Sequence, residues 1–201
     1  MGRIFCTQKS LILASASPRR QQFLTELGLE YQVQAAEINE TPHSGELPLD
    51  FVRRMAREKA MVVAESFPQH WIAAADTIVV LEGEILGKPA SAHGAQEMLM
   101  RLSGREHVVL TGFSLVAKNW GVAEVSSVAT RVVFQPFSAR EAQAYVATGE
   151  PMDKAGSYGI QGLGAFLVKE LRGSYTNVVG LPLVEFLHLL QKHGVAVPCG
   201  S

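Results

Sequence analysis

Two serines and two arginines follow an apolar run near the start of the chain, in "LILASASPRR" at residues 11–20. Ser17 is a suitable N-cap and the next residue, a proline, suits a first helical turn, so the pattern predicts a strand, a tight loop and a helix. A helix N-terminus presents unpaired N–H groups, and guanidinium groups add charge-assisted bonds to phosphate oxygens. Ser15, Ser17, Arg19 and Arg20 therefore form a candidate phosphate-binding site. The alternative is a capped helix whose arginines are solvated.

A carboxylate stands inside a nearly continuous apolar run, "WIAAADTIVVL" at residues 71–81, which is typical of a central strand. An unpartnered polar group in such surroundings costs about 2–7 kcal/mol, so Asp76 needs water, a partner or a bound cation. We expect Asp76 to be exposed at a cleft. The alternative is a structural carboxylate that pairs with a neighbour and orients a turn.

Three further charged residues could take part in the same chemistry. Lys88 lies in "LGKP", where glycine and proline fix the backbone of a turn and leave the ammonium group projecting. Glu37 and Glu40, in "AAEINE", could supply oxygen ligands to a metal ion. A solvated turn lysine and exposed loop glutamates are the structural alternatives.

The segments around these residues alternate between strand and helix patterns, which predicts one mixed α/β domain over residues 1–201. On the long helix, Arg57 and Lys59 are expected to lie off the apolar face. A glycine-rich segment at 150–165 is expected to be a long functional loop. The expected elements are strands at 9–14, 31–36, 71–81 with a hairpin into 85–89, 106–118, 122–134 and 166–171, and helices from Ser17 to Gly28, at 47–67, from Ser91 to Gly104, from a capping box of Ser138 and Glu141, and at 181–194.

Composition excludes several classes of protein. The net charge is −1, with 18 basic and 19 acidic residues, so the chain as a whole has no positive electrostatic field that would attract nucleic acid or an anionic membrane. The sequence contains no uninterrupted run of about 18 apolar residues, so no membrane span is predicted. The N-terminal apolar run is too short for a signal peptide. Cys6 and Cys199 lie near opposite ends of the sequence, outside any disulfide framework, which favours a reducing cytoplasm.

Seven blocks occur in an order and spacing that resemble the Maf family of nucleotide pyrophosphatases: "SASPRRQQFLTELGL", "AREKA", "AADTIVV", "ILGKP", "LSGREHVVLTG", "GEPMDKAGSYGIQG" and "GSYTNVVGLPL". The resemblance extends from about residue 10 to residue 193. It implies a two-lobed α/β fold with a mixed sheet, similar to the inosine-triphosphate pyrophosphatases, with the substrate in a central cleft. It also implies cleavage of a nucleoside triphosphate to a monophosphate and pyrophosphate, with Mg²⁺ or Mn²⁺ as cofactor. The expected partner is the nucleoside triphosphate, and a homodimer is the oligomeric state that we leave as an open alternative.

The resemblance implies a role for each matching residue. Asp76 would accept a proton from water attacking the α-phosphorus and, with Glu40, would bind the cation. Asn39 stands where the family usually has aspartate before that glutamate. The residues that would stabilise charge on the phosphate chain are Arg19, Arg20, Lys59 and Lys88. Because no Walker A sequence occurs, an NTPase that releases the γ-phosphate is disfavoured.

The form "DKAGSYGIQG" resembles the branch of the family that acts on dTTP and UTP. Its amide residue, Gln161, offers both a donor and acceptors, which match the edge of uracil or thymine, and Thr77 is a second specificity position. Gln161 could instead satisfy only the loop backbone. Alternatives at the level of function are a 7-methyl-GTP or inosine-type purine pyrophosphatase, and a nucleotide-sensing inhibitor of septum formation without turnover.

Overall fold

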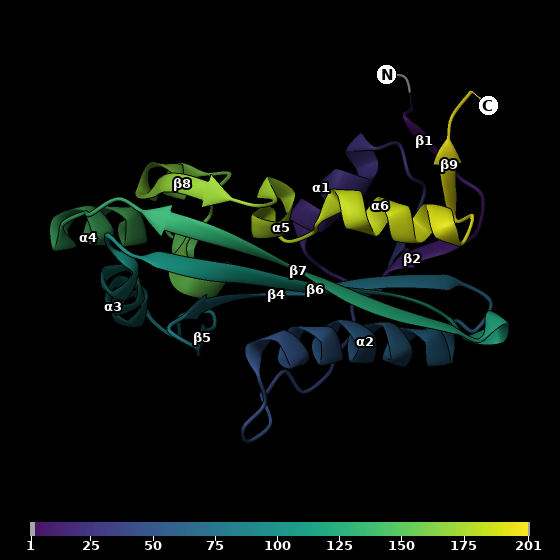
Figure 1. The fold of residues 1–201 in the computed structure, drawn as a ribbon, viewed down its shortest axis with the longest axis horizontal. Helices are drawn as coiled ribbons and strands as arrows, with labels where there is room; N and C mark the ends of the chain where they lie inside the picture. Colours follow the sequence, from purple (N-terminus) through teal and green to yellow (C-terminus); the bar gives the residue numbers. More distant parts are fainter. Residues whose placement is uncertain (1–2, 201) are drawn as a thin grey trace. The chain divides into compact units, whose positions relative to one another are not determined.

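The structure, a computed structural model, describes residues 3–200 and shows a mixed α/β fold (Figure 1). Seven strands form one sheet in the order β3–β2–β4–β6–β7–β8, with β5 beside β4, and two further strands, β1 and β9, pair with each other. The strands are β1 Phe5–Thr7, β2 Leu11–Leu13, β3 Gln32–Val33, β4 Trp71–Leu81, β5 Glu84–Leu86, β6 Glu106–Ala117, β7 Val122–Phe134, β8 Val168–Arg172 and β9 Ala196–Pro198.

Six α-helices and four short 3₁₀ helices complete the described chain, and no helix within residues 3–200 is long and apolar enough to cross a bilayer. The α-helices are α1 Pro18–Glu26, α2 Pro48–Ser66, α3 Ala92–Leu102, α4 Ala139–Ala147, α5 Tyr175–Val179 and α6 Leu183–Lys192. The 3₁₀ helices are η1 Lys118–Trp120, η2 Glu150–Asp153, η3 Ala155–Ser157 and η4 Leu163–Leu167.

The chain divides into two compact units, in agreement with the expected two lobes. Unit 1 consists of Met1–Asp76, Thr111–Ser127 and Gly180–Ser201, and unit 2 of Thr77–Leu110 and Val128–Val179. The three long strands β4, β6 and β7 contribute residues to both units. That one domain covers residues 1–201 stays a prediction.

In unit 1, α2 covers one face of the strands, and α1 and α6 lie on the other face (Figure 1). Strands β2 and β4 are parallel, with Leu13 opposite Ala73, so the loop after β2 lies near the residues just before Asp76. The core under α2 is made of small and branched side chains, namely Ile12, Ala14, Ala60, Val63, Ala64, Ile72, Ala74 and Val116.

Pairing of β1 with β9 corrects the interpretation of the two cysteines. The antiparallel ladder places Cys6 opposite Val197, and Cys6 and Cys199 form a disulfide with their Cα atoms 5.2 Å apart. Sequence distance concealed this contact, because the two residues are 193 positions apart. Disulfides are typical of oxidising compartments, so the cysteines no longer support a reducing cytoplasm.

In unit 2, α3 and α4 pack together over an apolar core that includes Leu99, Val132, Phe134 and Tyr145. The predicted capping box is present, because Ser138 Oγ accepts from the Glu141 N–H and the Glu141 carboxylate accepts from the Ser138 N–H. The glycine-rich segment that was expected to be a long functional loop contains η2 and η3 and runs into η4.

Candidate active site

Two buried charges of unit 1 form an ion pair between α2 and β4. Lys59 is 9% exposed and Asp76 is 8% exposed, and Lys59 Nζ lies 2.7 Å from Asp76 Oδ1. A buried charge is tolerated when an opposite charge lies close to it, so each residue explains the burial of the other. Two expectations are corrected here: Asp76 is paired and buried, and Lys59 does not lie off the apolar face of its helix. Arg57 is exposed, as predicted.

Close packing of α2 on β6 brings Lys59 to the sheet. A Cβ atom at Gly112 of β6 would lie 2.2 Å from the carbonyl oxygen of Val52, so only glycine permits this approach. Two residues later, Ser114 Oγ donates to the carbonyl oxygen of Ala56 at 2.8 Å. The helix turn that carries Lys59 is therefore held directly against the strands.

A second carboxylate reaches the same ammonium group. Glu40, in the segment between β3 and α2, places Oε1 2.8 Å from Lys59 Nζ, so Lys59 bridges Glu40 and Asp76. The structure thus brings together three residues that were predicted separately. Glu37 is exposed and forms no ion pair with another residue in the described range 3–200.

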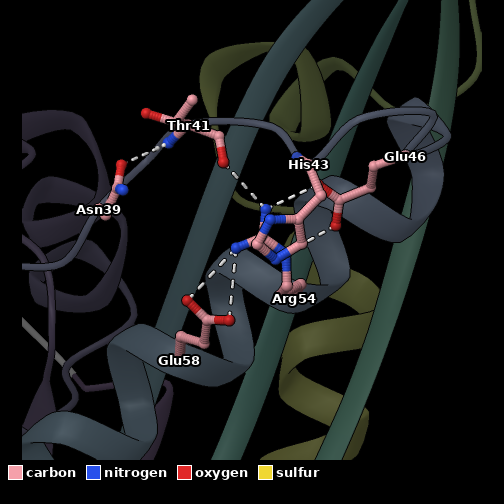
Figure 2. A network of polar contacts seen from close by, with 6 residues as sticks. All are labelled: Asn39, Thr41, His43, Glu46, Arg54 and Glu58. Carbon is pink, nitrogen blue, oxygen red and sulfur yellow. Dashed lines mark hydrogen bonds and ion pairs between the residues drawn. The ribbon is translucent and has the colours of Figure 1, made fainter.

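The segment that carries Glu40 is tied to α2 by Arg54 (Figure 2). Nε and Nη2 of Arg54 each lie 2.6 Å from an oxygen of Glu46, and Nη2 also donates to the Thr41 carbonyl oxygen at 3.2 Å. Hydrogen bonds from Arg54 outweigh desolvation and lower the pKa of Glu46 to about 2, so the paired carboxylate is charged at neutral pH. Arg54 was not predicted as part of the site, because nothing in the local pattern shows that it binds Glu46 and Thr41 of the preceding segment.

The donor set around Lys59 fits a divalent cation that brings its own oxygen ligands. Within residues 3–200, no group of three or more His, Cys, Asp or Glu side chains could hold a metal ion. Glu40 and Asp76 supply two carboxylates, and both are paired with Lys59. Mg²⁺ commonly binds through one or two carboxylates and takes its remaining ligands from water and substrate phosphates.

Arg20, of the "SPRR" block, is held by the protein. Its Nε donates to the Gly180 carbonyl oxygen at 2.8 Å, and its Nη1 donates to Ser15 Oγ at 3.1 Å. Burial lowers the pKa of Arg20 from its usual value, whereas the charges of Asp76 and Glu40 raise it. Arg20 therefore belongs electrostatically to the same cluster of charges.

The start of α1 has the features of an anion site. Ser17 occupies the N-cap position and a proline begins the helix, as predicted, but the Ser17 side chain makes no capping hydrogen bond. The Ser17 N–H instead donates to Ser15 Oγ at 3.3 Å. Arg19 follows on the first turn and is partly exposed. First-turn N–H groups, two hydroxyls and Arg19 are thus present in one short segment.

Alanine substitutions are expected to separate the two arginines. Arg19→Ala should lower kcat/KM for a nucleoside triphosphate and change the free energy of unfolding by only about 0–1 kcal/mol, because the side chain is partly exposed. Arg20→Ala should lower kcat/KM and also cost about 1–3 kcal/mol, because it leaves the partners of two hydrogen bonds unsatisfied. Urea unfolding and steady-state kinetics test both, with Arg57→Ala as the matched control. Unchanged kinetics in both variants would make these arginines structural.

The other predicted site residues belong to unit 2. Thr77 directly follows Asp76 on β4 and is partly buried. Lys88 is exposed in the turn after β5, and Gln161 is exposed between η3 and η4. Among the described residues, the side chains of Lys88 and Gln161 form no ion pair or hydrogen bond, so the folded chain does not use their polar groups for its own stability.

Comparisons with known proteins show which family the chain is similar to. A family model described as Maf-like protein matches residues 10–193. A dTTP/UTP pyrophosphatase of Desulfotalea psychrophila is 52% identical over 187 residues, which cover 93% of this chain and 96% of the relative. One from Myxococcus xanthus is 51% identical over 191 residues, 95% of this chain and 96% of the relative. The solved structure of the Staphylococcus aureus Ham1 protein aligns with a TM-score of 0.46 and 16% identity, covering 63% of this chain and 72% of that chain.

Proposed function

Because this chain belongs to the Maf family, we propose that it hydrolyses dTTP and UTP to the nucleoside monophosphate and pyrophosphate. The dTTP/UTP pyrophosphatases compared above match it along nearly their whole length, at 96% of each relative. The observation that carries the proposal is the cluster in which Lys59 bridges Asp76 and Glu40. A carboxylate beside fixed cations can serve hydrolysis of a phosphoric anhydride, because the carboxylate accepts a proton from water and the cations stabilise the developing negative charge.

In the proposed reaction, Asp76 accepts a proton from the water that attacks the α-phosphorus. The new bond joins the water oxygen to that phosphorus, the bond from the α-phosphorus to the α–β bridging oxygen breaks, and pyrophosphate leaves with the bonding electrons. Lys59 fixes the orientation of the Asp76 carboxylate through the 2.7 Å contact. Arg19 and Arg20 stabilise negative charge on the phosphate chain, since fixed cations need no reorganisation as charge develops.

Glu40 and Asp76 are the residues proposed to hold a divalent cation, Mg²⁺ or Mn²⁺. When bound, the cation would neutralise the triphosphate and orient it. Lys59 keeps the two carboxylates close together, and Arg54 fixes the segment from which Glu40 projects. This chain would therefore contribute two carboxylate ligands, and phosphate and water oxygens would supply the others.

Three residues of unit 2 complete the proposal. Lys88 contributes a further positive charge toward the phosphates. Gln161 reads the base through its amide, which can donate to a carbonyl oxygen and accept from the N–H of uracil or thymine. Thr77 shapes the same specificity. The exposure of Lys88 and Gln161 supports these roles, because an exposed polar group can exchange water for a ligand.

A panel of substrates tests the proposed function. With Mg²⁺ or Mn²⁺, kcat/KM should be higher for dTTP and UTP than for CTP, GTP or 7-methyl-GTP, because each unpaired buried donor or acceptor costs roughly 1–3 kcal/mol. Pyrophosphate should be released without an equivalent amount of free phosphate. Gln161→Glu should erode the preference, with Gln143→Glu, on α4, as the matched control.

Each other outcome of this panel identifies a different function. A wild-type preference for 7-methyl-GTP or inosine triphosphate would replace the pyrimidine assignment with a purine one. Nucleotide binding without turnover of any substrate would favour the nucleotide-sensing alternative. An unchanged ranking in Gln161→Glu would remove Gln161 from base recognition.

A further inference from the structure

Gln161 lies in a segment whose backbone is held on both sides by one buried tyrosine and one glutamate of unit 2. Tyr145, on α4, is 3% exposed, and its hydroxyl accepts from the Gly159 N–H at 3.1 Å. The same hydroxyl donates to Glu150 Oε1 at 2.8 Å. Beyond Gln161, the carboxylate of Glu150 accepts from the N–H groups of Leu163 at 2.8 Å and Gly164 at 3.1 Å.

Three glycines allow the segment to lie this close to the pair. A Cβ atom at Gly162 would lie 2.4 Å from Glu150 Oε2, and one at Gly164 would lie 2.5 Å from Tyr145 Oη. At Gly159 it would lie 3.3 Å from Glu150 Oε1 and 2.8 Å from Cε of Lys154. A larger residue at Gly162 or Gly164 would collide with the carboxylate or the hydroxyl that binds the segment, so the glycine spacing in "GIQGLG" matches the positions of Tyr145 and Glu150.

The charge states of Tyr145 and Glu150 favour these hydrogen bonds. Burial opposes ionisation of Glu150, but hydrogen bonds from Leu163, Tyr145 and Gly164 lower its pKa below the usual value. Burial and the Glu150 carboxylate raise the pKa of Tyr145, so its hydroxyl stays a donor at neutral pH. Glu150 is therefore an anionic acceptor for two backbone N–H groups and one hydroxyl.

We propose that Tyr145 and Glu150 are positioning residues for base selection, which set the place of Gln161 by fixing the backbone before and after it. The inference rests on the proposed function, in which Gln161 reads the base. Gln161 has no side-chain hydrogen bond of its own among the described residues, so its position depends on the backbone that carries it. Tyr145 and Glu150 thus act through the segment without touching the nucleotide.

Two substitutions test the proposal with little change in volume. Glu150→Gln replaces one acceptor oxygen by an amide donor, and Tyr145→Phe removes only the hydroxyl. Each should lower the ratio of kcat/KM for dTTP to kcat/KM for CTP by about tenfold, the effect of about one lost hydrogen bond to a base. Inhibition by pyrophosphate, which lacks a base, should stay unchanged. Glu170→Gln, an exposed carboxylate of the same unit, is the matched control and should leave the ratio unchanged.

A double-mutant cycle separates positioning from general support of the fold. In a Gln161→Ala background, Glu150→Gln and Tyr145→Phe should no longer change the dTTP to CTP ratio. An equal loss of kcat/KM for every nucleotide, an unchanged ratio, or an effect that persists without Gln161 would each overturn the inference. If Glu150→Gln does not fold, Tyr145→Phe decides alone. A wild-type enzyme without preference for dTTP and UTP would instead overturn the proposed function, and the inference with it.

Discussion

Asp76→Asn is expected to lower the single-turnover rate constant for dTTP hydrolysis by at least ~100-fold, the low end for loss of a general base. Asparagine has nearly the same shape as aspartate but cannot accept the proton of the attacking water as an anion. The measurement is single-turnover hydrolysis of dTTP, so that slow product release does not hide the chemical step. Asp50→Asn, an exposed carboxylate on α2, is the matched control and should retain wild-type turnover. Near-normal turnover of Asp76→Asn would remove this residue from the mechanism.

The same variant should lose stability, because Lys59 stays buried. Removal of one partner of a buried ion pair commonly costs about 3–5 kcal/mol. The loss should be smaller here, because Glu40 still lies 2.8 Å from Lys59 Nζ. Circular dichroism and urea unfolding establish that kinetics are measured on folded protein. A second substitution, Lys59→Met, removes the buried positive charge and should restore part of the lost stability to Asp76→Asn without restoring turnover.

Chelation of divalent cations is expected to abolish hydrolysis, and Mg²⁺ or Mn²⁺ should restore it. The physical reason is that attack on a highly anionic triphosphate requires charge neutralisation. Glu40→Gln should raise the Mg²⁺ concentration for half-maximal activity, because it removes one of two carboxylates, and a metal titration of initial rates measures that shift. Glu37→Gln, in the same segment, should behave as wild type. Full activity in excess chelator would contradict the proposed carboxylate site.

Local patterns predicted the fold where one segment determines its own structure. The apolar run at 71–81 coincides with β4, and the capping box at Ser138 was found as predicted, because both signals lie within a few residues. Strands β1 and β9 were missed, since each has three residues and their pairing joins opposite ends of the chain. The 3₁₀ helices near Gln161 were missed because tertiary bonds to Glu150 hold that backbone.

The candidate site, like the fold, could be predicted only where the signal is local in the sequence. The residue types and their family blocks made Asp76, Lys59 and Glu40 candidates, but they did not predict that Lys59 would bridge the two carboxylates. Helical spacing alone placed Lys59 off the apolar face, and its partner Asp76 lies 17 residues further along the chain. Burial of a charge depends on such a partner, so a pattern confined to one helix could not predict it.

The disulfide between β1 and β9 determines how the folded chain responds to mechanical force. When the two ends are pulled apart, the load passes through the bond between Cys6 and Cys199, which are 193 positions apart, and bypasses the residues between them. With the bond intact, the chain between the two cysteines cannot extend under the load. After reduction, the same segment can extend by roughly 650 Å at about 3.4 Å per residue. An oxidised molecule held at its ends would therefore keep both units under no tension, and reduction would expose them to the full applied force.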